Sequence, residues 1–208
     1  MRKEEKLNTT VTLSKETATE FDFIVCLDAS GSMASPSKRF AGKTRWQEAQ
    51  ETIFGLASAL EAFDADGIDV ILFGGAVETF EGVTTAKVAD IFASRSPRGS
   101  TPLHTALAAV VAKQSATSKN TVAIIFTDGE PDDRAAAAKI ITDASNALEK
   151  DEALTFLFVQ IGDDAGAAKY LAQLDDDLTG KFDIVDAVTA AEADSMEPID
   201  LINKAIND

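Results

Sequence analysis

The sequence predicts an α/β protein with a Rossmann-like, doubly wound fold, a three-layer sandwich around a mainly parallel six-stranded sheet with one antiparallel edge strand. Three observations lead to this prediction. Strand-like apolar runs alternate with amphipathic helical segments along the chain. Several of these runs are largely unbroken by polar residues, as expected of strands covered on both faces. No internal repeat, linker or low-complexity tract separates the elements. We therefore expect one domain over residues 21–208, preceded by a polar arm at 1–20.

The first half of the domain begins with a buried strand at 21–27, which stops at a polar turn. After a basic loop, apolar residues recur every three or four positions and predict an amphipathic helix. A second strand at 69–73 then turns at a glycine pair, and 76–80 returns as the antiparallel edge strand, which carries Glu78. The apolar positions of the helix are Trp46, Ala49, Ile53, Leu56, Leu60 and Phe63.

The second half repeats the alternation of helices and strands. A short helix at 84–94 precedes the loop 96–102, whose last residue, Pro102, suits the first turn of a helix that extends to about 113. Strands are expected at 121–127, 154–161 and, more weakly, 182–185; helices are expected at 134–149, 165–174 and 199–206. The helix at 134–149 is expected to bury Ile140, Ala144 and Leu148. In the arm, Val11 and Leu13 alternate in a way that also allows a short edge strand.

The charge of the chain argues against several classes of partner. Its 208 residues include 19 Lys and Arg against 35 Asp and Glu, a formal net charge of -16. That sign repels nucleic acid and anionic membrane surfaces, so neither is expected as a partner. Cys26, the single cysteine, lies in an apolar run and is expected to be a buried hydrophobic residue. The sequence contains no signal-like or membrane-spanning segment, which makes the cytoplasm the expected location.

Two strands end in aspartate, and ligands of open α/β sheets bind at the carboxyl ends of strands. If Asp28 and Asp128 face each other about 6 Å apart at a dielectric of about 20, they repel by roughly 3 kcal/mol, a cost that a cation would reverse. Ser30, Ser32 and Thr101 add neutral hydroxyl oxygens, a set that suits a hard cation. We predict a site for Mg²⁺, with Mn²⁺ or Ca²⁺ as alternatives.

Three sequence segments carry a resemblance to a known family. Asp28-Ala29-Ser30-Gly31-Ser32 matches the DxSxS motif of the von Willebrand factor A domain, and 99–103 and 127–129 resemble its threonine loop and its second aspartate segment. The resemblance extends from about Phe21 to the C-terminus. It implies a metal-ion-dependent adhesion site, in which Ser30, Ser32 and often Thr101 contact the cation while Asp28 and Asp128 frequently act through water.

The resemblance also implies a function. An Asp or Glu of a partner protein typically completes the metal shell of such a domain, and Met33 after Ser32 fits the bacterial and intracellular members of the family. Similar bacterial domains occur beside AAA+ ATPases, chelatases and stress-response systems, so an AAA+ ATPase or another component of a multi-protein system is one expected partner. We therefore expect a protein-binding module and not an enzyme.

Two other functions stay open on the sequence alone. The first is a metal-dependent hydrolase or phosphatase that uses the same cation as a Lewis acid. It lacks an evident nucleophile, and Ser30 stands where a phosphoaspartate enzyme usually has its second carboxylate. The second is a scaffold whose site is vestigial.

Other polar segments are expected to have structural roles. Gly42-Lys43-Thr44 resembles the end of a P-loop, but Ser37 stands where the first glycine belongs. Residues 64–67 resemble part of a calcium loop that lacks further carboxylates, and they are expected to form a turn. His104, the single histidine, is assigned a structural or rim role, and the aspartates at 163–164 and 175–177 are assigned to solvated loops.

Overall fold

The sheet has the predicted architecture. The computed structural model describes residues 12–14, 17–61 and 67–207. Six strands form one sheet in the order β3-β2-β1-β4-β5-β6, and every neighbouring pair is parallel except β2 and β3. The predicted antiparallel edge strand is thus confirmed. The strands are β1 (Phe21–Asp28), β2 (Ile68–Gly74), β3 (Ala76–Val83), β4 (Asn120–Thr127), β5 (Leu154–Gln160) and β6 (Val185–Thr189).

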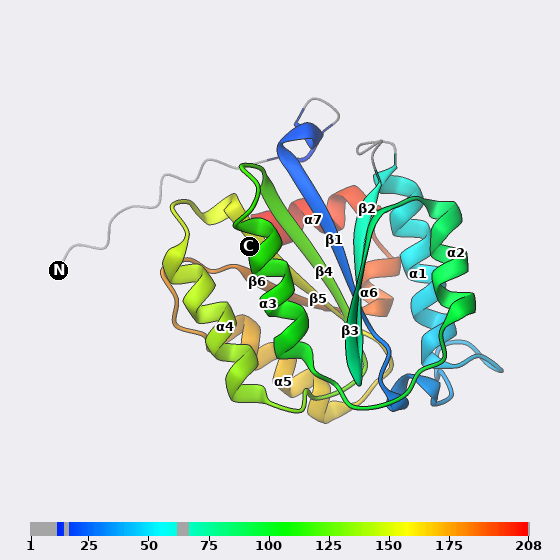
Figure 1. Ribbon diagram of the computed structural model, residues 1–208. Helices are drawn as coiled ribbons and strands as arrows, with labels where there is room; N and C mark the ends of the chain where they lie inside the picture. Colours follow the sequence, from blue (N-terminus) through cyan, green and yellow to red (C-terminus); the bar gives the residue numbers. More distant parts are fainter. Residues whose placement is uncertain (1–11, 15–16, 62–66, 208) are drawn as a thin grey trace.

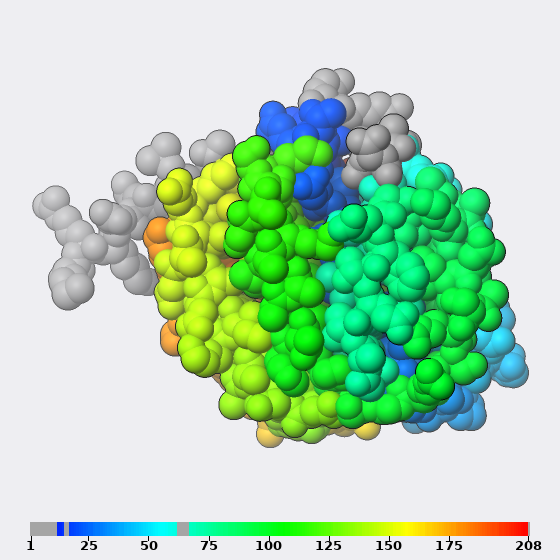
Figure 2. Space-filling view, in the orientation of Figure 1, coloured from blue at the N-terminus to red at the C-terminus, as the bar shows by residue number. Residues whose placement is uncertain are grey.

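Helices cover both faces of the sheet, which confirms the three-layer arrangement (Figure 1). One face is covered by α1 (Arg45–Leu60), α2 (Thr85–Ser94), α6 (Ala190–Asp194) and α7 (Pro198–Ile206). The other is covered by α3 (Leu103–Gln114), α4 (Arg134–Ala147) and α5 (Ala165–Asp176). Figure 2 shows α3 and α4 side by side over this second face. Short 3₁₀ helices are η1 (Ala18–Glu20), η2 (Gly31–Ala34) and η3 (Asp151–Ala153).

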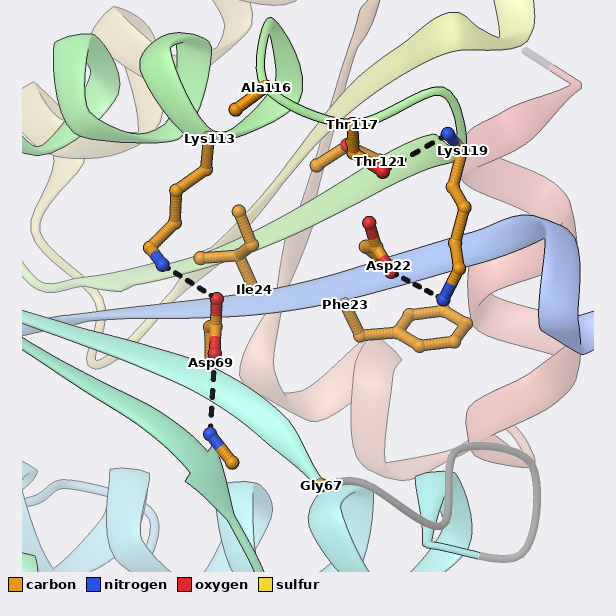
Figure 3. Close-up of a pocket in the computed structure, with 11 residues that line it drawn as sticks. Asp22, Phe23, Ile24, Gly67, Asp69, Lys113, Ala116, Thr117, Lys119 and Thr121 are labelled. Carbon is orange, nitrogen blue, oxygen red and sulfur yellow. Dashed lines mark hydrogen bonds and ion pairs between the residues drawn. The ribbon is translucent and has the colours of Figure 1, made fainter.

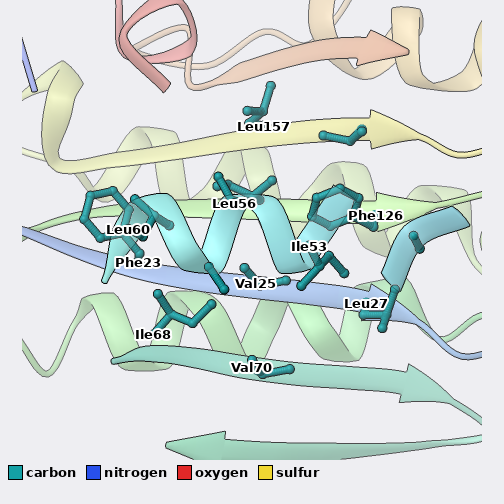
Figure 4. Packing of buried hydrophobic residues seen from close by; sticks show 14 of the residues in the cluster. Phe23, Val25, Leu27, Ile53, Leu56, Leu60, Ile68, Val70, Phe126 and Leu157 are labelled. Carbon is teal, nitrogen blue, oxygen red and sulfur yellow. The ribbon is translucent and has the colours of Figure 1, made fainter. Parts of the chain in front are cut away.

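Burial alternates along β1 in the way a sheet between two helical layers requires. Val25 and Leu27 join the core beneath α1, whereas Ile24 and Cys26 join the core beneath α3. Figure 4 shows side chains of α1, including Ile53, packed over the central strands. Fully burying an aliphatic side chain of this size stabilises a fold by about 1.5–3 kcal/mol. The predicted burial of Cys26 is confirmed, and burial raises the pKa of its thiol.

Side chains close the first turns of several helices. Thr44 forms a capping box at the start of α1, because its hydroxyl accepts from the Gln47 amide at 3.3 Å and the Gln47 side chain accepts from the Thr44 amide at 2.9 Å. Asp133 and Asp164 cap α4 and α5 with one bond each, in which the carboxylate accepts from the amide of Ala136 or Ala167 at 2.8 Å. Thr44 and Asp164 are thus helix caps, a role that the sequence did not predict for either residue.

The C-terminal third differs from the prediction at two places. The strand expected at 182–185 is wrong, since β6 occupies Val185–Thr189. Phe182 is held by the Ser145 side chain of α4: its amide donates to the Ser145 hydroxyl at 2.9 Å, and its carbonyl accepts from the same hydroxyl at 2.7 Å. The five-residue helix α6 follows β6 directly and was not predicted.

Smaller differences concern the helix boundaries and the arm. Helix α4 ends at Ala147 and buries Ile141, while Ile140 is only partly buried, because the helix is rotated slightly from the predicted face. Residues 12–14 are not in a strand; Leu13 is buried and its amide donates to the Asn203 side chain of α7 at 2.6 Å. Phe63, Val11 and the calcium-loop-like turn at 64–66 lie outside the described residues.

The order of the strands fixes where a ligand can bind. From β1 the chain moves outward to β2 and β3, then returns to the other side of β1 as β4. The carboxyl ends of β1 and β4, which point towards the lower edge of Figure 1, therefore flank the switch point of the sheet. In the described part of the chain, none of the helices is both long and apolar enough to cross a bilayer.

Candidate functional site

Asp28, the last residue of β1, is fully buried at the switch point. Its Oδ1 accepts from the Ser30 amide at 2.8 Å, which folds the following turn back onto the carboxylate. Its Oδ2 accepts from the Thr127 hydroxyl of β4 at 2.7 Å. The carboxylate is therefore oriented from both sides by groups of two neighbouring strands.

A chain of hydrogen bonds connects this turn to Asp128. The Ser32 hydroxyl donates to Asp128 Oδ1 at 2.7 Å, and the Oγ atoms of Ser30 and Ser32 are 2.9 Å apart. Asp128 is 1% exposed and Ser30 is 2% exposed, whereas Ser32 is exposed. Four of the five predicted site residues thus form one connected group, with buried carboxylates below and a hydroxyl open to solvent above.

Thr101 reaches the same place through its loop. The loop is bonded to the Asp28 turn by two backbone contacts, Arg98 N to Ala29 O at 2.8 Å and Gly31 N to Gly99 O at 3.1 Å. The Thr101 amide donates to Asp132 Oδ1 at 3.0 Å. Among the described residues, no hydrogen bond joins the Thr101 hydroxyl to the other four site residues. The loop is adjacent to the connected group, but of the five predicted side chains only that of Thr101 is not hydrogen-bonded to this group within the described residues.

Gly99 allows this loop to lie so close. Its φ is +86°, and a Cβ atom there would lie 2.9 Å from Gly75 of the β2–β3 turn. The Gly75 amide also donates to the Ser100 carbonyl at 3.2 Å. The backbones of the two turns are therefore in direct contact, and a side chain at position 99 has no room.

Burial raises the pKa of Asp28 to about 6. Hydrogen bonds from Ser30 and Thr127 oppose this shift, and the negative charge of Asp128 adds to it. The like charges and the burial make the ionised site costly, as the sequence predicted. A bound cation is the group that would offset this cost.

The arrangement of oxygen atoms fits a small octahedral cation. Mg²⁺ holds oxygen ligands at about 2.0–2.1 Å, so two adjacent ligands of an octahedron lie about 2.9 Å apart. Ser30 Oγ and Ser32 Oγ have this separation, 2.9 Å. In the described part of the chain, no group of three or more His, Cys, Asp or Glu side chains is placed to hold a metal. A cation held here would need hydroxyl oxygens among its ligands, and such a set suits Mg²⁺ or Mn²⁺ better than Zn²⁺.

Three residues that contact the group were not identified from the sequence. Thr127 and Asp132 orient Asp28 and the Thr101 loop, and Arg45 Nη1 lies 2.7 Å from Asp128 Oδ2. For Thr127, the only sequence signal was its position directly before Asp128 in the motif segment. Arg45 lies 83 residues before Asp128, and no local pattern connects the two.

A separate hollow of about 380 Å³ lies at the opposite, amino-terminal end of β1 and β4. Figure 3 shows that its charged side chains pair with one another: Lys113 with Asp69 and Lys119 with Asp22, both at 2.8 Å. The hollow is thus lined by internally balanced charges and is remote from the predicted site.

The remaining polar candidates lie apart from the connected group. Asp163 pairs with Lys38 at 2.7 Å on the surface, in agreement with a solvated loop. His104 is partly buried in the first turn of α3, and its Nδ1 has no partner among the described residues.

Comparison with solved structures shows the same fold in proteins of low sequence identity. The manganese-loaded TRAP protein of Plasmodium vivax has a TM-score of 0.64 at 19% identity, over 91% of this chain and 74% of that one. The PilB minor pilin of Streptococcus sanguinis has a TM-score of 0.64 at 13% identity, over 89% and 61%. The vWF domain of the pilus tip protein Mfa5 from Porphyromonas gingivalis has a TM-score of 0.51 at 13% identity, over 90% and 95%.

This chain therefore spans less than two thirds of the pilin, and 30% of the SpaC pilus adhesin from Lactobacillus rhamnosus, which matches at a TM-score of 0.58. A comparison with curated proteins gave no match. The family model of the von Willebrand factor type A domain matches residues 23–130, which include both aspartates, both serines and the threonine of the candidate site. The chain belongs to the von Willebrand factor type A domain family.

Proposed function

We propose that this domain binds a divalent cation at the group of Asp28, Ser30, Ser32, Thr101 and Asp128, and uses it to bind an acidic residue of a partner protein. Mg²⁺ is the proposed cation, with Mn²⁺ or Ca²⁺ as alternatives. The hydroxyls of Ser30, Ser32 and Thr101 would hold it directly, and the two aspartates would act through water or through the serines.

The observation that carries this proposal is the pair of hydroxyl oxygens 2.9 Å apart between two buried carboxylates. Each hydroxyl has a carboxylate to which it can donate: Ser32 to Asp128 at 2.7 Å, and Ser30 to Asp28. Their lone pairs are then free for a cation. The family further supports the proposal, since its members are generally interaction or adhesion modules, and the TRAP protein was solved loaded with manganese.

An anionic partner group follows from the ligand set. Mostly neutral oxygens touch the cation, so much of its charge remains uncompensated at the open side, where Ser32 is exposed. A carboxylate from another protein is a hard, anionic ligand suited to that position.

Calorimetric titration with Mg²⁺ and Mn²⁺ tests the cation directly. Wild type is expected to bind one cation, and Asp28→Ala is expected to bind none. Asp143→Ala is the matched control, because Asp143 is an exposed carboxylate on α4 that pairs with Lys139 at 2.6 Å, away from the site. Absence of binding by wild type, or equal binding by Asp28→Ala, contradicts the proposal.

A metal-dependent hydrolase or phosphatase is the competing function. The Ser32 hydroxyl would be its nearest nucleophile, but it donates to a carboxylate that is itself paired with Arg45, a weak arrangement for a general base. Turnover of p-nitrophenyl phosphate that needs Mg²⁺ and disappears in Asp28→Ala would favour the enzyme. Cation binding without turnover favours the binding module.

The partner and the location are further proposals. An AAA+ ATPase or another component of a multi-protein system stays the partner predicted from the sequence, and the cytoplasm stays the predicted location. Affinity capture with this domain in Mg²⁺ or in EDTA, with Ser30→Ala and Thr101→Ala as controls, tests the cation-dependent part. Capture that is equal in all four conditions would instead indicate the vestigial scaffold.

A further inference from the structure

The strongest unexplained feature near the site is an ion pair between Arg45 and Asp128. Arg45 Nη1 lies 2.7 Å from Asp128 Oδ2, and the two side chains are 17% and 0% exposed. Ser32 occupies the other oxygen of the same carboxylate at 2.7 Å. Both oxygens of Asp128 are thus engaged by this chain's own donors, one neutral and one charged.

The position of Arg45 runs against local preference. It is the first residue of α1, directly after the Thr44 cap, where the helix dipole disfavours a positive charge. A residue that breaks a local rule usually has a compensating partner elsewhere in the fold. Asp128, 83 residues away, is that partner.

The loop after β5 leaves space for the guanidinium. Gly162 has a φ of +78°, and a Cβ atom there would lie 2.8 Å from Arg45 Nε and 3.2 Å from its Cζ. A Cβ atom at position 162 would require the guanidinium to shift from this position. Two separated segments, the start of α1 and the turn after β5, are therefore shaped around this side chain.

We propose that Arg45 is a positioning residue that fixes Asp128 as an outer ligand and weakens the hold of the site on its cation. This inference rests on the proposed cation binding. With Oδ2 bound to Arg45 and Oδ1 bound to Ser32, Asp128 acts on the cation through the serine and does not swing into direct contact. The fixed positive charge of Arg45 also repels a dication at the neighbouring hydroxyls.

The charges explain what this arrangement does. The two buried carboxylates and the guanidinium, counted without the solvent-exposed Asp132, carry a net charge of minus one, so a dication leaves this buried group with one positive charge. Without Arg45 the loaded site would be neutral. Arg45 therefore lowers cation affinity and keeps the loaded site in need of an anion.

The test compares Arg45→Gln with wild type in two measurements on the full chain. Gln retains a donor for Asp128 but loses the charge. Titration with Mg²⁺ alone is expected to show roughly tenfold tighter binding by Arg45→Gln. Thermal unfolding in EDTA is expected to show a melting temperature lower by about 4 °C, because a buried carboxylate loses its ion pair. A purely structural role would weaken both properties, so these opposite signs identify the positioning role.

Lys38→Gln is the matched control, since it removes the same charge from a surface pair with Asp163, the neighbour of Gly162, without touching Asp128. It is expected to change Mg²⁺ affinity by less than about twofold. Arg45→Lys, which keeps the charge, is expected to stay within about threefold of wild type. Weaker or unchanged Mg²⁺ binding by Arg45→Gln, or tighter binding by Arg45→Lys, overturns the inference.

A second pair of variants separates this inference from the proposed function. In EDTA, Arg45→Gln is expected to lower the melting temperature of wild type but not that of Asp128→Asn. An equal drop in both backgrounds shows that Arg45 does not act through Asp128 and overturns its positioning role. If wild type binds no Mg²⁺, the proposed function fails, whereas the contact between Arg45 and Asp128 is still decided by this metal-free comparison.

Discussion

Neutralising Asp28 is expected to stabilise the metal-free protein. Burial raises the pKa of Asp28 from 3.8 to about 6, so the folded state holds a proton more tightly than the unfolded chain does. Stability from this group is therefore fully present below about pH 4 and is lost as the pH rises through about 6. Relative to the unfolded chain, the ionised Asp28 side chain therefore lowers the stability of the folded protein by about 3 kcal/mol at pH 7.5 and by about 1 kcal/mol at pH 4.5.

Asp28→Asn removes this cost and keeps the geometry. The Asn oxygen can accept from the Ser30 amide, and its amide group can donate to the Thr127 hydroxyl. Guanidinium unfolding in EDTA is expected to show the variant more stable than wild type by about 3 kcal/mol at pH 7.5, with the gap narrowing to about 1 kcal/mol at pH 4.5. The variant should also lose Mg²⁺ binding.

Asp22→Asn is the control on the same strand. Asp22 forms a partly exposed pair with Lys119 at 2.8 Å, so its neutralisation is expected to destabilise the protein by at most about 1 kcal/mol. If Asp28→Asn is no more stable than wild type in EDTA at pH 7.5, or if its advantage does not depend on pH, the reasoning about the buried carboxylate is refuted.

Four further predictions follow from the cation site and the core. Mg²⁺ at a hundred times its Kd is expected to raise the stability of wild type by about 2.7 kcal/mol, measured by denaturant unfolding; no shift would contradict cation binding. Phe126→Ala, in the core of β4, is expected to cost about 3–5 kcal/mol in the same assay, and a loss below 1 kcal/mol would mean that the core repacks. Thr44→Ala is expected to cost about 1 kcal/mol by removing the α1 cap, with Thr44→Ser close to wild type. Gly99→Ala is expected to destabilise the protein by more than about 1 kcal/mol and to weaken Mg²⁺ binding in calorimetry, whereas Gly55→Ala, on α1 with open space around it, should do neither.

The sequence was sufficient for the layers and the centre of the sheet because periodicity reports burial. The central strands are apolar on both sides, so β1, β4 and β5 were found within one residue of their ends. At β6 the signal failed. Phe182 and Ile184 look like a strand, but the Ser145 side chain holds the Phe182 backbone, a tertiary contact that no local pattern records. Helix α6 has five residues, too few for a helical period to be visible.

The candidate site was predictable as far as motif residues go. Both aspartates, both serines and the threonine loop meet at one edge because parallel strands bring their carboxyl ends together. The register could not be predicted: Leu27 lies beside Phe126, which places Thr127, and not Asp128, next to Asp28. The contact between Arg45 and Asp128 could not be predicted either, because it depends on how the start of α1 packs against the turn at Gly162.

The contact between Gly99 and Gly75 joins the threonine loop to the outermost hairpin of the sheet. Because no side chain separates the two backbones, we expect a displacement of the loop at Thr101 to shift Gly75 and, with it, the ends of β2 and β3. A ligand that moves the threonine loop is therefore expected to move the edge hairpin of the sheet as well.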